Sequence, residues 1–158
     1  MSNSTVKPAN GKLGVLVVGL GAVTSTFMTG VLMARKGLTK PVGSMTQYDK
    51  IRVGKGADKK YLKYDEIVPM ASLDDIVFGA WDVYPANAYQ SAIYAEVLQE
   101  KDIEPVKDEL EQIVPMKAAF DHNYAKRLNG DNVMTGKTRW EMVEQLREDI
   151  RNFKKEKG

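Results

Sequence analysis

The chain has 158 residues, of which 43% are hydrophobic and 28% charged, the balance of a single globular domain. Its 23 basic and 21 acidic residues nearly cancel, so it lacks the strong positive charge typical of nucleic-acid-binding domains. No cysteine is present, which excludes disulfides and cysteine-ligated zinc. The amino terminus has no apolar signal segment, and the longest apolar stretch is too short to span a membrane. We therefore expect a cytoplasmic domain with neither nucleic-acid nor membrane partners.

A polar leader is expected over residues 1–12, followed by a strand, a glycine turn and a helix. The run Leu13–Val18 is aliphatic on both faces, which favours a buried strand of a parallel sheet over an edge strand. Residues 24–36 favour a helix that stops at Gly37. The apolar side of this helix is predicted to comprise Phe27, Val31, Met33 and Ala34.

Residues 48–64 combine six basic side chains with three tyrosines and two glycines. Such a stretch could contact a phosphate backbone, and that alternative would require salt-sensitive binding. A solvated surface loop or hairpin is the more common structure, and we predict it here. Residues 75–78 then form a short apolar run, predicted to be a buried strand closed by residues 79–82 and ending at a carboxylate, Asp82.

Three helices are expected in the second half of the chain. Asn87 and Gln90 form a pair typical of a capped helix, predicted to run to about residue 100. A second helix is predicted from Pro105 to just before Pro115. The third is the clearest, because Thr138-Arg-Trp-Glu is a capping box. Its apolar residues recur at intervals of three and four, which predicts core packing: Trp140, Val143, Leu146, Ile150 and Phe153.

Gly19-Leu20-Gly21 lies where a dinucleotide-binding turn belongs, directly after a strand and before a helix. Glycines permit the tight turn and a close approach of the backbone to a pyrophosphate, and the helix start offers free amides. Thr24 replaces the third glycine of the usual pattern, and residues 42–47 lack the expected acidic ribose ligand. A plain strand-to-helix turn therefore remains an alternative at this point.

Two other features suggest chemistry but fit it poorly. Residues 130–138 resemble a phosphate loop, but five residues separate the glycines instead of four and no buried strand precedes them. Thr138 is better explained as a helix cap. His122 is the only histidine, so we expect it to be structural or solvent-facing and predict no metal site.

The sequence resembles the bacterial branch of the myo-inositol-1-phosphate synthases over nearly all of residues 12–158. Several blocks in the same order carry the resemblance, and together they are far more specific than a glycine turn. They are LGVLVVGLGAV (13–23), RKGLTKPVGS (35–44), DIVFGAWD (75–82), NAY (87–89), PM (115–116), AFDHNY (119–124), KRLNG (126–130) and EQLREDIR (144–151).

The resemblance implies an isomerase of inositol and phospholipid biosynthesis that converts D-glucose 6-phosphate to 1D-myo-inositol 3-phosphate (1L-myo-inositol 1-phosphate). In that family a hydride leaves C5 of the substrate and a proton leaves C6. The enediolate then closes on C1 by an aldol step, and the hydride is returned. The cofactor is NAD, which is regenerated in each cycle. The fold implied is α/β, a Rossmann-like domain with a parallel sheet.

The resemblance also implies cofactor-binding positions in this chain. Asp82 would bind the adenosine ribose. The other positions are Gly19, Leu20, Gly21, Ala22 and Val23 in the turn, and Ala118 and Ala119 further along. The sequence departs from the family at Ala22-Val-Thr-Ser25, where eukaryotic members have two asparagines, and at Ala80, where glycine is commoner.

The family's catalytic lysines and its tetramer-forming region correspond to sequence beyond Gly158. We therefore expect a partial NAD-binding domain over residues 13–158, incomplete at its carboxyl-terminal end, and assign no catalytic residue. An early end to such a sheet predicts an unpaired strand edge and one uncovered apolar face. The alternative is a free-standing nucleotide-binding or regulatory module without catalysis, which the reading frame after Gly158 would distinguish.

Overall fold

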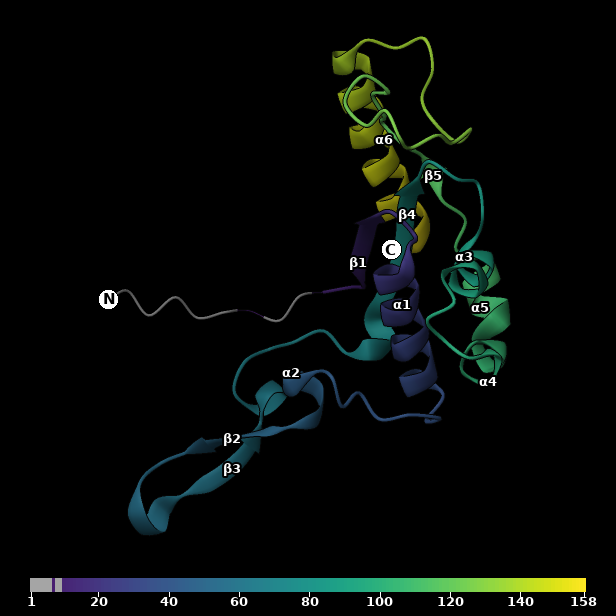
Figure 1. Ribbon diagram of the computed structural model, residues 1–158. Coiled ribbons are helices and arrows are strands. Elements are labelled where there is room, and N and C mark those ends of the chain that lie inside the picture. Colours follow the sequence, from purple (N-terminus) through teal and green to yellow (C-terminus); the bar gives the residue numbers. More distant parts are fainter. Residues whose placement is uncertain (1–6, 8–9) are drawn as a thin grey trace.

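The computed structural model describes residue 7 and residues 10–158, so most of the predicted leader of residues 1–12 lies outside the described residues (Figure 1). Its centre is a parallel sheet in the order β1-β4-β5, formed by β1 (Leu13–Val18), β4 (Ile76–Asp82) and β5 (Met116–Lys117). Strands β1 and β4 pair over six positions, whereas β4 and β5 share two. The predicted α/β class with a parallel sheet is confirmed.

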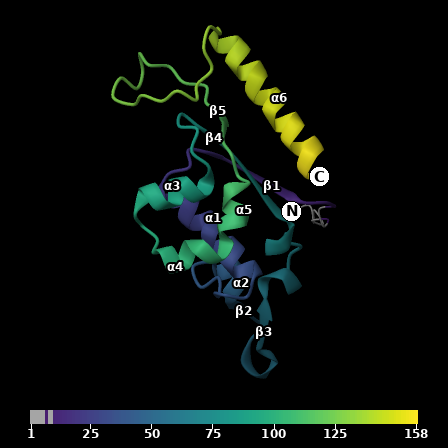
Figure 2. The ribbon, with the colours of Figure 1, turned by 90° about the vertical axis from the view of Figure 1, so that its right-hand side faces the viewer.

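Four helices cover one face of this sheet: α1 (Ala22–Arg35), α3 (Ala88–Ala95), α4 (Glu100–Ile103) and α5 (Lys107–Glu111). Figure 2 shows them on the side of the strands opposite α6 (Arg139–Lys157). The main hydrophobic core lies under them. Its fully or nearly fully buried members are Leu20, Met28, Ala80, Ala88, Ala92, Val106 and Leu110.

The predicted helix after the glycine turn is present, but a different set of its residues is buried. Val31 faces the core as expected, whereas Phe27 is partly exposed at the helix edge. Ser25 and Thr29 are buried instead, alongside Met28 and Leu32. Hydrophobic periodicity does not reveal that these small polar side chains are buried.

The prediction that β1 is a buried central strand was wrong. Among the described strands it pairs only with β4, so it forms one edge of the sheet. Val18, at its end, is 88% exposed. The aliphatic sequence of β1 suits a strand with neighbours on both sides, whereas its outer edge is unpaired among the described strands.

The strand predicted at residues 75–78 extends to Asp82, because residues 79–81 continue the pairing with β1 and Asp82 pairs with Lys117 of β5. Gly79 is within the strand for a packing reason. A Cβ atom there would lie 2.7 Å from side-chain atoms of both Leu16 and Phe153. Glycine thus allows β1 and α6 to approach β4 closely, and it does not mark a turn.

The first two helices predicted after Asp82 are shorter in the structure. Asn87 and Gln90 form the expected capping box of α3, but the helix ends at Ala95 because Glu96 adopts a left-handed conformation with φ of 51°. The second predicted helix is split into a short turn and α5. The 3₁₀ turns in the described part of the chain are Gly56–Asp58, Tyr64–Glu66, Leu73–Asp75 and Glu104–Val106.

Residues 48–64 form the predicted hairpin. A short helix, α2 (Met45–Tyr48), leads into β2 (Lys50–Val53) and β3 (Lys60–Lys63), which pair antiparallel. The hairpin projects away from the helices and the parallel sheet (Figure 1). Its residues are mostly exposed, in agreement with a solvated element.

The predicted capping box of α6 is present, with the Thr138 hydroxyl accepting from the backbone N–H of Glu141. The prediction that its apolar stripe forms core was wrong, because no residue of α6 is buried. Phe153 lies against β4, and the indole N–H of Trp81 donates to Asp149 at 2.9 Å. The first turns of α6 extend past the sheet in Figure 2, so they have no sheet surface to cover. Among the described residues, no helix is long and apolar enough to cross a bilayer.

Candidate functional site: the carboxyl edge of the parallel sheet

The carboxyl ends of the three parallel strands meet at one edge of the sheet. Gly19 follows β1, Asp82 is the last residue of β4, and Ala118 follows β5. Ligands of open α/β sheets bind at this edge, because the loops and helix starts that follow parallel strands converge there. The fold thus gathers residues that are 36 to 99 positions apart in the sequence.

Glycine occupies the two positions of the turn, 19 and 21, for different structural reasons. Gly19 has φ of 96°, a conformation that favours glycine, and its N–H donates to the carbonyl of Trp81 at 2.7 Å. Gly21 has an ordinary φ of −70°, and a Cβ atom built on it would meet nothing within 4 Å. Among the described residues no contact therefore requires glycine at position 21, and its open face leaves room for a ligand to approach the backbone.

Helix α1 begins directly after this open face. The first backbone bond of the helix runs from the N–H of Ser25 to the carbonyl of Gly21, so the amides of Ala22, Val23 and Thr24 have no partner within the helix. No side chain caps this end, and its first turn has no acidic residue. Val23 is 85% exposed. Free amides and the positive end of the helix dipole together form a site suited to a phosphate group.

Asp82 holds the glycine turn directly. Its Oδ2 accepts a hydrogen bond from the N–H of Leu20 at 2.5 Å, and its Oδ1 accepts one from the N–H of Tyr84 at 2.9 Å. A carboxylate oxygen can accept more than one hydrogen bond, so both oxygens retain acceptor capacity for a hydroxyl group. An acidic side chain, absent from residues 42–47, thus lies beside the glycine turn at the end of the next strand of the sheet.

The other predicted cofactor residues differ in whether their side chains are buried or exposed at this edge, which the sequence did not predict. The side chain of Leu20 is buried in the core, so only its backbone faces the turn. Ala118 is also buried, and its N–H and carbonyl bond to Asn132 and Met134. Ala119 is exposed. We identify Asn132, which the sequence analysis missed, as a further residue at the ends of β4 and β5.

The histidine and the helix-capping threonine considered in the sequence analysis make no hydrogen bond with the glycine turn or Asp82 in the described structure. His122 is exposed and packs edge-on against Phe120, with ring centroids 4.8 Å apart. Thr138 caps α6, as predicted. Within the described part of the chain, no cluster of three or more histidine or acidic side chains could hold a metal ion.

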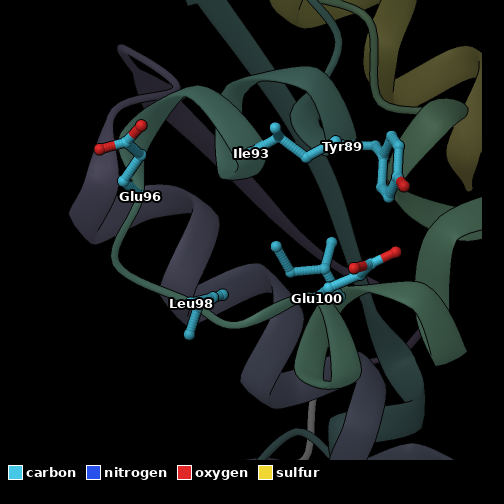
Figure 3. A pocket seen from close by; sticks show the side chains of 6 residues that line it. Tyr89, Ile93, Glu96, Leu98 and Glu100 are labelled. Atoms are coloured by element: carbon cyan, nitrogen blue, oxygen red, sulfur yellow. The ribbon is translucent and has the colours of Figure 1, made fainter.

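A hollow of about 440 Å³ lies between α3 and α4, away from the glycine turn (Figure 3). Tyr89 and Ile93 line it from α3, and Leu98 and Glu100 line it from the following segment. The Tyr89 hydroxyl donates to Glu104 at 2.9 Å, which raises the pKa of Tyr89. None of the predicted cofactor residues lines this hollow, so it is not part of the candidate site.

Comparison with known proteins identifies the family. The family model that matches residues 13–158 is an NAD-binding model described as myo-inositol-1-phosphate synthase. Inositol-3-phosphate synthase 1 of Bacteroides thetaiotaomicron is 59% identical over 150 residues, covering 94% of this chain and 34% of the relative. Inositol-3-phosphate synthase 1 of Oryza sativa subsp. japonica is 34% identical over 158 residues, covering 90% of this chain and 31% of the relative.

The fold agrees with this result. The crystal structure of inositol-3-phosphate synthase from Caenorhabditis elegans matches 96% of this chain with a TM-score of 0.80 and 27% identity, and 32% of that protein is covered. The chain thus spans about a third of the length of the relatives it matches. It belongs to the myo-inositol-1-phosphate synthase family, and residues 13–158 match the NAD-binding part of that family.

Proposed function

We propose that this chain supplies the NAD-binding part of an inositol-3-phosphate synthase, an enzyme that converts D-glucose 6-phosphate to 1D-myo-inositol 3-phosphate. Membership of the family supports the reaction. The observation that carries the cofactor proposal is the open face of Gly21 beside the uncapped start of α1. When bound, NAD supplies a hydride acceptor that takes two electrons from the sugar and returns them within one cycle.

The residues at the sheet edge have separate tasks in this proposal. The amides of Ala22 and Val23 would donate to the pyrophosphate, which Gly21 allows to approach. Gly19 and Leu20 would shape the turn through their backbones. Asp82 would accept hydrogen bonds from the adenosine ribose hydroxyls. Ala118 and Ala119 would border the cofactor beyond β5.

The remaining features of the enzyme are proposals about a longer protein. The substrate glucose 6-phosphate, the aldol cyclisation and a homotetramer are properties of the family that we propose for the whole enzyme. No residue of this chain is assigned a catalytic role. A domain of residues 13–158 dedicated to the cofactor, and a location in the cytoplasm, are part of the same proposal.

Isothermal titration calorimetry of the purified chain with NAD tests the cofactor proposal. We expect measurable binding by the parent chain and a loss on the order of tenfold or more in Gly21→Val, because the new side chain occupies the space needed by the pyrophosphate. Gly43→Val is the matched control, since a Cβ atom at position 43 also meets nothing within 4 Å but lies far from the turn along the chain.

Asp82→Asn and Asp82→Ala test the ribose contact in the same experiment. Asparagine keeps one acceptor for the turn but loses the charge, so we expect weaker NAD binding with the fold retained, and a larger loss for alanine. Undiminished binding by Gly21→Val and Asp82→Ala would contradict the proposed site. No heat of binding from the parent at millimolar NAD would contradict NAD binding by this chain alone.

A further inference from the structure

We propose that Asn132 is a positioning residue of the cofactor site, acting through Asp82. The inference rests on the proposed NAD site and adds a residue that touches neither the glycine turn nor the open face of Gly21. Its side chain fastens the carboxyl ends of β4 and β5 to each other. It thereby fixes the place of the carboxylate that holds the turn.

The carboxamide of Asn132 bridges two strands. Its Nδ2 atom lies 2.9 Å from the carbonyl oxygen of Asp82 and 3.1 Å from that of Met116, with the carbonyl of Pro115 at 3.5 Å. An amide nitrogen carries two hydrogens, so it can donate to both strands at once. Asparagine is partly buried there, where a carbonyl without a donor would cost free energy.

The backbone of Asn132 makes the same connection. Its N–H donates to the carbonyl of Val83 at 2.9 Å, and its carbonyl accepts from the N–H of Ala118 at 2.9 Å. Gly130 brings the chain close enough, because a Cβ atom at position 130 would lie 2.2 Å from the carbonyl oxygen of Val83. The segment 130–134 is therefore pressed against the end of β4 and the start of the loop after β5.

The sheet needs this connection at its carboxyl edge. Strands β4 and β5 share only two residue pairs, Trp81↔Met116 and Asp82↔Lys117. Strand β1 pairs with β4 as far as Trp81, but so short a ladder holds β5 only weakly beside Asp82. Asn132 supplies donors to the main chain on both sides of the ladder, and Asp82 then presents Oδ2 to the N–H of Leu20. A route of direct contacts thus runs from Asn132 through Asp82 to the glycine turn.

Asn132→Ala, with Asn152→Ala as a matched control on the exposed surface of α6, tests the proposal. We expect Asn132→Ala to weaken NAD binding on the order of tenfold, and the control to bind as the parent does. A purely structural role would lower stability without changing the turn in the folded state. The second readout is therefore the ¹⁵N–¹H resonance of the Leu20 amide, recorded without NAD, which reports its short bond to Asp82.

We expect the Leu20 and Tyr84 amide resonances to move in folded Asn132→Ala and to stay in place in Asn152→Ala. An affinity within twofold of the parent, or unmoved Leu20 and Tyr84 resonances, overturns the proposal. The spectroscopic arm does not depend on the ligand, so failure of the parent to bind NAD would contradict NAD binding by this chain alone and leave this test intact.

A variant that fails to fold does not remove the test. The side-chain amide protons of Asn132 in the parent chain are expected to exchange slowly with water, unlike those of the exposed Asn152. Exchange of both at the same rate would show that the carboxamide makes no lasting bonds to β4 and β5, and would overturn the proposal. Asn132→Ser keeps a single donor, so its affinity for NAD should lie between those of the parent and Asn132→Ala. An affinity equal to either of the two would count against a donor role.

Discussion

The two faces of the parallel sheet are covered very differently. On one face α1, α3, α4 and α5 enclose a core in which Met28, Val106 and Leu110 have no solvent exposure. On the other, α6 lies across the strands without burying any of its own residues. Both sides present amphipathic helices to the same three strands. The comparison shows that an apolar stripe on a helix is buried only where other helices or strands cover its whole length.

The largest difference between the faces should appear on truncating a core residue. Met28→Ala removes a fully buried side chain from α1, and we expect a loss of about 2–5 kcal/mol in the free energy of unfolding because a cavity remains. Urea denaturation followed by circular dichroism measures it. Met45→Ala is the control, since Met45 is 66% exposed and should change little. Equal effects of the two variants would contradict the assignment of the core.

A smaller effect is expected where α6 touches the sheet. Gly79→Ala places a Cβ atom 2.7 Å from side-chain atoms of Leu16 and Phe153, and the required shifts should cost roughly 1–3 kcal/mol of unfolding free energy. Combining it with Phe153→Ala should reduce that cost, because one of the two neighbours is gone. A cost that is the same in both backgrounds, measured in a double-mutant cycle, would show that α6 does not pack against β4.

The cap at the start of α6 should contribute still less to the free energy of unfolding. Thr138→Ala removes the hydroxyl that accepts from the N–H of Glu141, and loss of such a cap costs about 1 kcal/mol. We expect fraying of the first turns of α6, seen as faster amide exchange there, with little change in α1. Ser72→Ala is a useful comparison, because Ser72 caps only a single 3₁₀ turn.

The same helix start should respond to acid. The N–H of Thr138 lowers the pKa of Glu141, and the N–H of Asn123 together with Arg139 lowers that of Asp121. A lowered folded-state pKa means that the stabilisation is complete above the unfolded values of 4.5 and 3.8 and is lost as the pH falls through the folded values. Amide exchange of α6 between pH 6 and pH 3, corrected for intrinsic rates, should show this loss. Glu141→Gln should reduce it, and an unchanged acid response would assign it to other groups.

The smallest effect is expected at the exposed end of the α6 stripe. Trp140 is 68% exposed, so Trp140→Ala should change the free energy of unfolding by less than about 0.5 kcal/mol. A loss comparable with that of Met28→Ala would mean that Trp140 is covered in solution, and a change in oligomeric state by light scattering would identify a second copy as the cover.

Much of the local structure could be predicted from particular residues. The bounds of β1, the capping boxes at Asn87 and Thr138, and the exposed hairpin at residues 48–64 all follow from neighbours in sequence. A strand of a parallel sheet followed from the aliphatic run Leu13–Val18, and the family resemblance implied the α/β class. These features depend on backbone conformation and short-range hydrogen bonds, which nearby residues control.

Other features depend on contacts between distant parts of the chain, and these the sequence alone could not provide. The extension of β4 through Gly79 depends on the close approach of Leu16 and Phe153. The end of α3 at Glu96 has no glycine or proline to mark it. The family resemblance pointed to Asp82, whereas its bond to the N–H of Leu20 appears only once β1 and β4 lie side by side.

The sequence by itself therefore determined β1, the glycine turn, the capped starts of α3 and α6, the hairpin and the family of this protein. The tertiary structure alone decided which apolar stripes are buried, that β1 forms an edge, and that Asn132 joins the ends of β4 and β5. The physical reason is the range of the interactions. Helix caps and turns involve residues three or four positions apart, whereas burial and strand-to-loop hydrogen bonds depend on which distant segments the fold brings into contact.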